Sequence, residues 1–199
     1  MEPDRLAKDL IALRLKAFNL IKERSFERRE VVLSSGKKSN YYLDLKPTMM
    51  HPEGINLLCE LIYDRLIRLP SVHYVGGLEL GAVPIIGPLT IFAFMKGRHI
   101  PGFFVRKEVK THGTKKLIEG VSDGELRGQN VIILDDVTTE GESAMKAVRA
   151  SRSAGAKVVS VLSVVDREAG AADLFKGEGL PFEALFHASE FLKATEPAT

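Results

Sequence analysis

The N-terminal quarter of the chain combines one helical pattern with two short extended ones. From 4 to 24, apolar residues recur at intervals of three and four with charged residues between them, which predicts an amphipathic helix. Two apolar runs, 31–33 and 41–43, flank the polar segment 34–40. Such runs around a turn-rich segment predict two strands joined as a hairpin. Residues 1–45 are therefore expected to form a small N-terminal appendage of one helix and one hairpin.

The rest of the chain alternates between strand and helix patterns. Helices are predicted at 52–68, from 83 onward and at 143–154, and strands at 73–78, 102–105, 131–134 and 158–165. The last two strands are almost continuously apolar, as is typical of strands buried on both faces. This alternation predicts an α/β fold with a central parallel sheet flanked by helices. Ligands of such sheets bind at the carboxyl ends of the strands, so functional residues are sought there.

Composition and charge narrow the class of protein. The 199 residues are 45% hydrophobic and carry a net charge of +2, which fits one globular domain spanning 1–199. A charge this balanced, without a long basic run, argues against nucleic-acid binding. The single Cys59 excludes an internal disulfide and a cysteine-based zinc site. The longest uncharged run, 80–95, is too short and too interrupted to span a bilayer, and the acidic N-terminus differs from a secretory signal, so we expect a cytoplasmic protein that does not bind membranes.

The segment 131–143 carries the sharpest chemical signal. Asp135 and Asp136 follow a predicted buried strand, and the hydroxyl groups of Thr138, Thr139 and Ser143 lead into a predicted helix. A helix N-terminus offers unpaired N–H groups and a favourable dipole to a phosphate. Paired carboxylates suit a magnesium ion, directly or through water, or the hydroxyls of a sugar. The alternative is that the two aspartates cap a loop, but the hydroxyl-rich continuation into a helix favours a ligand site.

This segment resembles the phosphoribosyl pyrophosphate signature of the type I phosphoribosyltransferases. The resemblance implies that Asp135 and Asp136 hold the ribose hydroxyls and, indirectly through substrate or water, a Mg²⁺ ion. It also implies that the 5′-phosphate is wrapped by the loop that follows, with Thr138, Thr139, Glu140, Gly141, Glu142 and Ser143. Small residues are common in the family where this chain has Glu140 and Glu142, so these side chains must point away and leave the backbone N–H groups to bind the phosphate.

A cationic run occupies 106–116, directly after the predicted strand 102–105. Its net charge is +4, so the rest of the chain, with +2 overall, sums to −2. A solvated charged face is the usual interpretation of such a run, and a mobile loop that closes over a polyanion is the alternative. The order Arg-Lys-Glu-x-Lys-x-His-Gly is similar to the catalytic loop of the orotate-specific members of the family, which favours the second. It implies that Arg106, Lys107, Lys110 and His112 contact pyrophosphate, with Lys110 neutralising charge on the leaving group.

Three further segments resemble the orotate-specific members. Arg167, after the strand at 158–165, is similar to the arginine that meets orotate, whose oxygens match a guanidinium, although a surface salt bridge is the simpler role for an isolated arginine. Segment 34–42 resembles the hood over the base and implies contacts from Tyr42 and Lys37, with Tyr41 and Lys38 as the alternatives, since adjacent strand residues face opposite ways. Segment 76–84 resembles the pyrophosphate loop; a plain tight turn is the alternative.

Together these resemblances imply an enzyme of pyrimidine nucleotide synthesis that transfers a group between two small molecules. It would move the phosphoribosyl group from phosphoribosyl pyrophosphate to orotate, giving orotidine 5′-phosphate and pyrophosphate, with Mg²⁺ as cofactor. Its catalytic residues would be Lys110, His112, Asp135 and Asp136. The resemblance further implies a homodimer whose loop 107–116 crosses to the neighbouring active site. A purine phosphoribosyltransferase and a non-catalytic phosphoribosyl pyrophosphate sensor are the alternatives, and the sequence at 106–113 argues against both.

Overall fold

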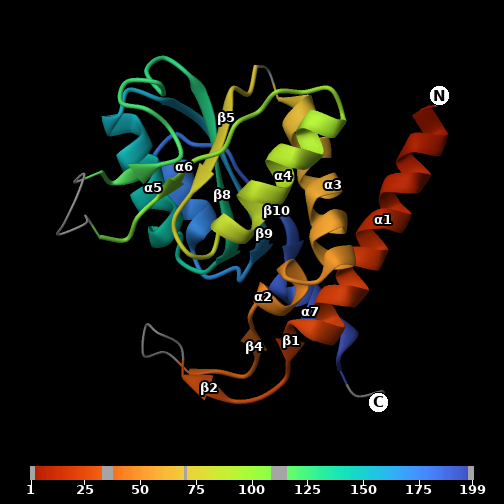
Figure 1. Cartoon of the computed structure of the whole chain (residues 1–199). Coiled ribbons are helices and arrows are strands. Elements are labelled where there is room, and N and C mark those ends of the chain that lie inside the picture. The colour runs from red at the N-terminus through yellow and green to blue at the C-terminus, as the bar shows by residue number, and fades with distance from the viewer. Residues whose placement is uncertain (1–2, 33–37, 70, 109–115, 197–199) are drawn as a thin grey trace.

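A four-stranded parallel sheet lies at the centre of the computed structural model, which describes residues 3–32, 38–69, 71–108 and 116–196 (Figure 1). The strands are β5 (Tyr74–Gly77), β8 (Asn130–Thr138), β9 (Lys157–Asp166) and β10 (Phe182–His187), in the order β10-β9-β8-β5. Beyond β5 the sheet continues through parallel bridges from Val75 to Gly102 and from Leu78 to Val105. At that edge β6 (Phe104–Val105) pairs with β7 (Ile118–Glu119). The predicted parallel α/β fold is confirmed.

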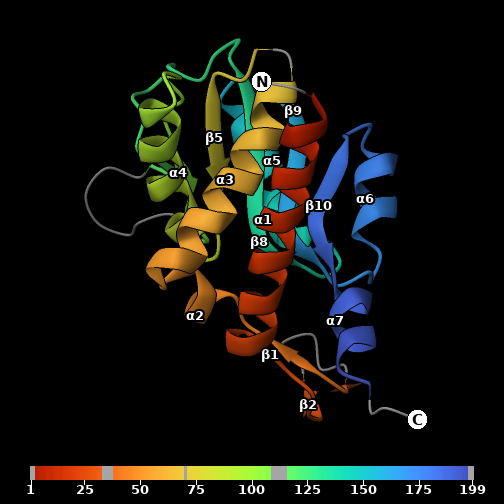
Figure 2. The same ribbon diagram turned by 90° about the vertical axis from the view of Figure 1, so that its right-hand side faces the viewer.

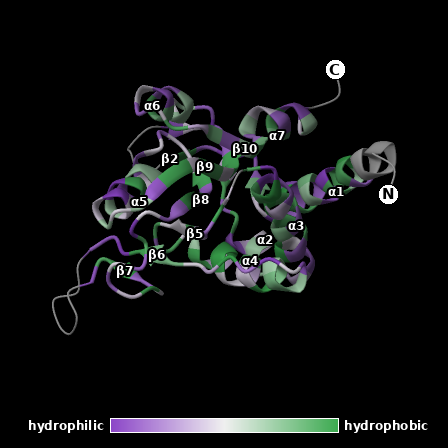
Figure 3. Ribbon diagram, turned by 90° about the horizontal axis from the view of Figure 1, so that it is seen from above, coloured by the Kyte–Doolittle hydropathy of each residue, from purple (hydrophilic) through white to green (hydrophobic). Residues whose placement is uncertain are grey.

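Helices cover both faces of the sheet. On one face lie α1 (Pro3–Arg24), α3 (Pro52–Arg68) and α4 (Val83–Met95), and on the other lie α5 (Glu142–Ser153) and α6 (Ala171–Gly177) (Figures 2 and 3). Along β8, Ile132 and Leu134 join one hydrophobic cluster while Val131 and Ile133 join the other. The strand is apolar at consecutive positions because it faces a core on both sides. Within the described chain, no helix is long and apolar enough to cross a membrane.

The largest difference between the predicted and observed ends of helices and strands is at β8, the strand that carries Asp135 and Asp136. The helices at 4–24 and 52–68 agree with α1 and α3 within one residue. However, β8 runs on to Thr138, so Asp135 and Asp136 belong to the strand itself instead of following it. The ladder with β9 continues through these positions, since Asp135 pairs with Ser163 and Thr138 with Asp166. Three elements were not predicted from the sequence: α6, β10 and the final helix α7 (Ala188–Ala194).

A small layer below the carboxyl edge of the sheet is formed by residues 26–32 and 38–49, which we call the hood (Figure 1). Its strands pair as β1 (Phe26–Glu27) with β4 (Tyr42–Leu43) and as β2 (Val31–Val32) with β3 (Lys38–Ser39), and α2 (Lys46–Met49) follows. The runs at 31–33 and 41–43 therefore do not pair with each other as expected. Phe26 and Leu43 face each other in register and are both buried, so burial of these two side chains favours the observed pairing.

Candidate functional site

Asp135 and Asp136 lie side by side near the end of β8, the strand buried between β5 and β9. Asp135 is 6% exposed and Asp136 is partly buried. Burial, and after it the charge of Asp136, raises the pKa of Asp135 to about 7; burial also raises the pKa of Asp136, which the positive charge of Lys46 partly offsets. Two buried carboxyl groups with so little cationic support gain stability from a ligand that brings hydroxyl donors or a cation.

A chain of hydroxyl contacts anchors Asp135 inside the sheet. Thr138 Oγ1 lies 2.8 Å from Asp135 Oδ2 and 2.9 Å from Ser163 Oγ, and Ser163 Oγ lies 3.0 Å from the carbonyl oxygen of Val165. Thr138 and Ser163 are buried. The Thr138 hydroxyl donates to Asp135, which favours the ionised carboxyl and lowers its pKa. Burial and the charge of Asp136 outweigh this contact, so the pKa of Asp135 is still raised.

Asp135→Asn is expected to stabilise the ligand-free protein at alkaline pH. Because the pKa of Asp135 rises on folding from its ordinary 3.8 to about 7, the folded state binds more protons, and stability is lost as the pH rises through this range. The substitution removes that loss and should raise the free energy of unfolding at pH 8 by up to about 4 kcal/mol, and by less at pH 5. Urea unfolding at both pH values measures the effect, with Asp9→Asn, at an exposed position of α1, as the control. An equal effect at the two pH values would contradict this account.

The turn from β8 into α5 has the features expected of a phosphate loop. Gly141 has a φ of +88°, which favours glycine, and a β-carbon there would press against Leu174 and Phe175 of α6. The first turn of α5 leaves backbone N–H groups without helical partners. Glu142 Oε2 lies 4.0 Å from Arg149 Nη1, further along α5, so this carboxylate extends along the helix.

The remaining side chains of this loop differ in accessibility. Thr138 turns its hydroxyl into the sheet, Thr139 is partly buried, and Glu140 and Ser143 are exposed. The Thr138 hydroxyl already contacts Asp135, so a direct contact of this hydroxyl with phosphate competes with its internal partners. The backbone of the turn, together with Thr139 and Ser143, offers the freer donors.

The loop at 78–82 lies directly against Asp136. A β-carbon at Gly81 would overlap the Asp136 carboxylate, so the close approach requires glycine. The peptide bond between Glu79 and Leu80 is cis. Glu79 connects this loop to the cationic run, because its N–H donates to the Val105 carbonyl at 2.8 Å and its carboxylate accepts from the Lys107 N–H at 3.0 Å.

The cationic run is described only at its two ends. Arg106 is partly buried, its N–H donates to the Leu117 carbonyl at 2.9 Å, and its Nη1 lies 4.0 Å from Glu119. Lys107 is exposed beside it. Lys110 and His112 lie outside the described residues. Arg106 and Lys107 thus start from the strand next to the loop at 78–82, on the same edge of the sheet as Asp136.

Arg167 lies at the same edge, where β9 ends. Its N–H donates to the carbonyl of Thr138 at 2.8 Å, which ties it to the end of β8. Its side chain reaches the hood: Cζ lies 4.2 Å from the centre of the Tyr41 ring, and Nη2 donates to Ser39 Oγ at 3.1 Å. These contacts hold the guanidinium between the sheet and the hood.

The structure gives the two tyrosines of the hood different surroundings. Tyr41 is 8% exposed and packs under Arg167, whereas Tyr42 is 38% exposed and has Arg29 over its ring at 4.5 Å. The tyrosine nearest to Arg167 is therefore Tyr41, while the sequence prediction selected Tyr42. Lys37 lies outside the described residues.

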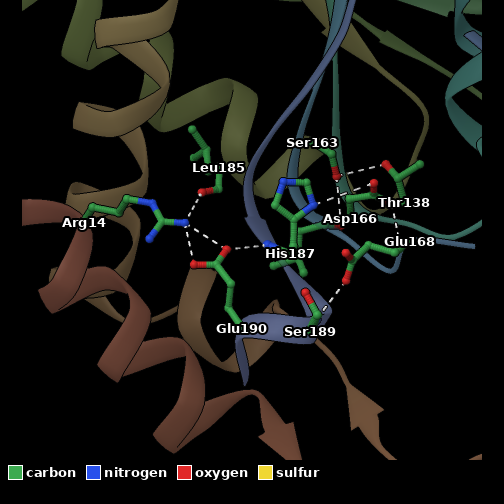
Figure 4. A network of polar contacts seen from close by, with 10 residues as sticks. Arg14, Thr138, Ser163, Asp166, Glu168, Leu185, His187, Ser189 and Glu190 are labelled. Carbon is green, nitrogen blue, oxygen red and sulfur yellow. Dashed lines mark hydrogen bonds and ion pairs between the residues drawn. The ribbon is translucent and has the colours of Figure 1, made fainter. Parts of the chain in front are cut away.

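A network of polar contacts supports the segment that carries Arg167 (Figure 4). The Glu168 N–H donates to Asp166 at 2.8 Å, and Glu168 in turn accepts from the Ser189 N–H at 2.9 Å. The carboxylate of Glu190, in the same helix α7, accepts a hydrogen bond from the Arg14 guanidinium of α1 at 2.7 Å. Helix α7 thus contacts the segment at the end of β9 through Ser189, and α1 contacts α7 through Arg14.

Sequence reasoning missed Lys46, Ser163 and Ser39 as members of the site. Lys46 donates to Asp44 at 3.0 Å and is the cation that acts on Asp136. Ser163 looks like any small residue of a buried strand, and only the register of β9 places it beside Thr138. Ser39 lies in the segment that resembles the hood, which pointed to the base site. Its contact with Arg167 could not be predicted because the two residues are 128 positions apart in the sequence.

Comparison with known proteins shows close relatives over nearly the whole chain. The orotate phosphoribosyltransferase of Bradyrhizobium diazoefficiens is 54% identical over 184 residues, which are 92% of this chain and 98% of the relative. Among solved structures, Mycobacterium tuberculosis orotate phosphoribosyltransferase in complex with Fe(III) dicitrate superimposes with a TM-score of 0.76 at 36% identity, and its complex with phosphoribosyl pyrophosphate with 0.73 at 35%. Both alignments cover 90% of this chain and 98% of the solved one. No family model matches.

Proposed function

The chain belongs to the orotate phosphoribosyltransferase family, and on that premise we propose which of its residues carry out the transfer. The enzyme moves the phosphoribosyl group from phosphoribosyl pyrophosphate to orotate and releases pyrophosphate, forming orotidine 5′-phosphate for pyrimidine nucleotide synthesis. One observation carries the site assignment: the carboxylates of β8, the turn into α5, the loop at 78–82 and Arg167 all meet at the carboxyl edge of one sheet. We propose that residues 1–199 form one domain around this edge.

Asp135 and Asp136 are assigned to the ribose of phosphoribosyl pyrophosphate. Ribose hydroxyls donate to these carboxylates, which replaces the water lost on burial and favours their ionised forms. Negative charge there also stabilises the positive charge that develops on the ribose as the bond to pyrophosphate breaks. Thr138 acts as a positioning residue through its contact with Asp135, and the backbone at 139–143 binds the 5′-phosphate.

The leaving pyrophosphate is assigned to the cations of 106–116 and to the loop at 78–82. Arg106 and Lys107 enter the site beside this loop, and Lys110 and His112 follow in the sequence. Fixed positive charge stabilises a leaving polyanion, so this step needs cations and no nucleophilic side chain of the enzyme. Lys110 is assigned to the bridging oxygen, where negative charge grows most.

A magnesium ion fits this donor set only with help from the substrate. The described residues contain no group of three or more His, Cys, Asp or Glu side chains that could hold a metal. Asp135 and Asp136 provide two buried carboxylates, so we propose that they hold Mg²⁺ through substrate hydroxyls or water. The bound ion would neutralise phosphate charge as pyrophosphate leaves.

Orotate is assigned to the surface beside Arg167, where the hood meets the end of β9. The guanidinium carries donors that match the carbonyl and carboxylate oxygens of the base. Tyr41 is a further candidate beside the predicted Tyr42 and Lys37, because its ring already supports Arg167. In this arrangement the hood sets base choice while the β8 edge binds the sugar.

Arg167→Ala is expected to raise the KM for orotate about 10-fold to 100-fold, because a charge-assisted bidentate contact contributes about 1.5–3 kcal/mol. The KM for phosphoribosyl pyrophosphate should change much less. Steady-state kinetics with each substrate varied in turn measures both constants. Arg29→Ala is the matched control, since Arg29 stacks on Tyr42 as Arg167 stacks on Tyr41. Equal increases in the two KM values would remove Arg167 from the base site.

We also propose that the enzyme is a homodimer whose loop 107–116 completes the neighbouring active site. An exposed apolar surface supports association: Ile91, Phe94 and Met95 recur on one side of α4, near its C-terminal end, and are 64–78% exposed. Apolar side chains gathered on a surface in this way mark contact sites. Leu80, in the loop at 78–82 at the other end of α4, is also 60% exposed. The cytoplasmic location stays a prediction.

A further inference from the structure

We propose that a cleft along α5, beside the proposed active site, binds a nucleotide through its phosphates and its base. The cleft has a volume of about 1100 Å³ and lies between α5 and the segments 105–107 and 116–127. Figure 3 shows α5 beside β6 and β7 on one side of the molecule. Pockets for small ligands commonly measure about 300–1,000 Å³, so a nucleoside triphosphate fits.

The cleft shares only Arg106 and Lys107 with the residues proposed to bind phosphoribosyl pyrophosphate. Its lining includes none of residues 135–143, none of 78–82 and not Arg167. On α5 it uses Lys146, Arg149, Ala150 and Ser153, which recur at intervals of three and four and so lie on one side of the helix. Arg106 and Lys107 line one end, where the cleft approaches the active site.

Positive charge dominates this cleft. Six cationic side chains line it against one acidic side chain, Asp123; they are Arg106, Lys107, Lys116, Arg127, Lys146 and Arg149. Lys116 is neutralised by Asp123 at 2.9 Å, Arg149 lies 4.0 Å from Glu142, and Arg106 lies 4.0 Å from Glu119. For Arg127 and Lys146 the described part of the chain provides no ion pair. Like charges gathered without counterions are stabilised by a bound polyanion.

Arg106 adds an unsatisfied donor to the same cleft. Its Nε is buried and has no hydrogen-bond acceptor among the described residues. A buried donor without an acceptor costs free energy that a ligand oxygen recovers.

Apolar side chains indicate that the ligand is more than an inorganic anion. Leu117, Ile118, Val121 and Ala150 are partly buried, and their remaining exposed surface lines the cleft next to the cations. A base can cover this surface while the phosphates reach the arginines and lysines. Inorganic phosphate or polyphosphate would leave it in water. The combination of several cations with an apolar wall therefore indicates a nucleotide carrying more than one phosphate.

Isothermal titration with ATP tests this site in the protein already saturated with phosphoribosyl pyrophosphate and Mg²⁺, so that the active-site phosphate positions are filled. We expect one ATP per chain. The double variant Arg127→Ser, Lys146→Ser should weaken ATP binding about tenfold or more, while its kcat stays at the wild-type value, since neither residue belongs to the active site. Adenosine and inorganic tripolyphosphate should each bind at least about tenfold more weakly than ATP.

The matched control removes the same charge elsewhere. Lys157→Ser, Lys176→Ser replaces two exposed lysines outside the cleft and should leave ATP binding unchanged. An equal loss in both double variants would show a nonspecific effect of net charge and overturn the site. Tripolyphosphate binding as tight as that of ATP would overturn the nucleotide assignment. Absence of ATP binding to the saturated wild type would overturn the proposal altogether.

Discussion

Asp135→Asn and Asp136→Asn are each expected to lower kcat/KM for phosphoribosyl pyrophosphate by on the order of 10²-fold or more, with the fold preserved. Asparagine keeps the volume of the side chain but loses the negative charge and turns one acceptor into a donor. In the ligand-free protein the change is favourable, because burial already opposes ionisation of these carboxyls. In this proposal the two residues reduce stability in the free enzyme and bind the ribose of the substrate.

The measurement is initial velocity with each substrate varied, together with urea unfolding of the same preparations. Asp173→Asn, at an exposed position of α6, is the control for a change of charge alone. Near-normal turnover in both active-site variants would refute the assignment of these carboxylates. Loss of activity accompanied by loss of stability at pH 8 would indicate a structural role instead.

Mixing two inactive variants is expected to restore activity if loop 107–116 serves the neighbouring subunit. In a heterodimer of Asp135→Asn and Lys110→Ala chains, one site receives both lesions and the other receives neither. Random exchange at equal concentrations should therefore recover about a quarter of wild-type activity, following the twofold symmetry of the dimer. The assay compares the mixture with each variant alone, after mass spectrometry has shown subunit exchange.

A second mixture provides the control. Asp135→Asn with Asp136→Asn places one lesion in every site, because both residues come from the same subunit, so no activity should return. If the first mixture also stays inactive although exchange is demonstrated, the loop serves its own subunit. A monomer that is active at all concentrations would equally contradict the shared site, while the reaction itself would be unaffected.

The central sheet could be predicted because each of its main strands is marked by a continuous apolar run of neighbouring residues. Val131 to Leu134 read as a strand buried on both faces, and in the structure these residues alternate between two hydrophobic clusters. The grouping of Asp135, Asp136 and the turn into α5 could also be predicted, since these residues are neighbours in sequence. The end of β8 was placed too early because carboxylates are unfavourable in a buried strand unless a ligand uses them.

The contacts that complete the base site could not be predicted, because they depend on tertiary packing. Ser39 and Tyr41 meet Arg167 only after the hood has folded against the end of β9. The pairing of Phe26 with Leu43 was missed for the same reason, since the nearer run at 31–33 offered an equally apolar partner. The cationic lining of the α5 cleft could not be predicted for the same reason. Its members include Arg127, Lys146 and Arg149, which form no run in sequence and come together only in the folded chain.

The most direct test of the central claim is the loss of orotate absorbance when the purified protein is mixed with orotate, phosphoribosyl pyrophosphate and Mg²⁺. The account predicts that orotate disappears with release of one pyrophosphate per molecule consumed, and that adenine and hypoxanthine are not used in its place. Consumption of a purine with orotate left unchanged would contradict it, as would an absence of turnover with every base.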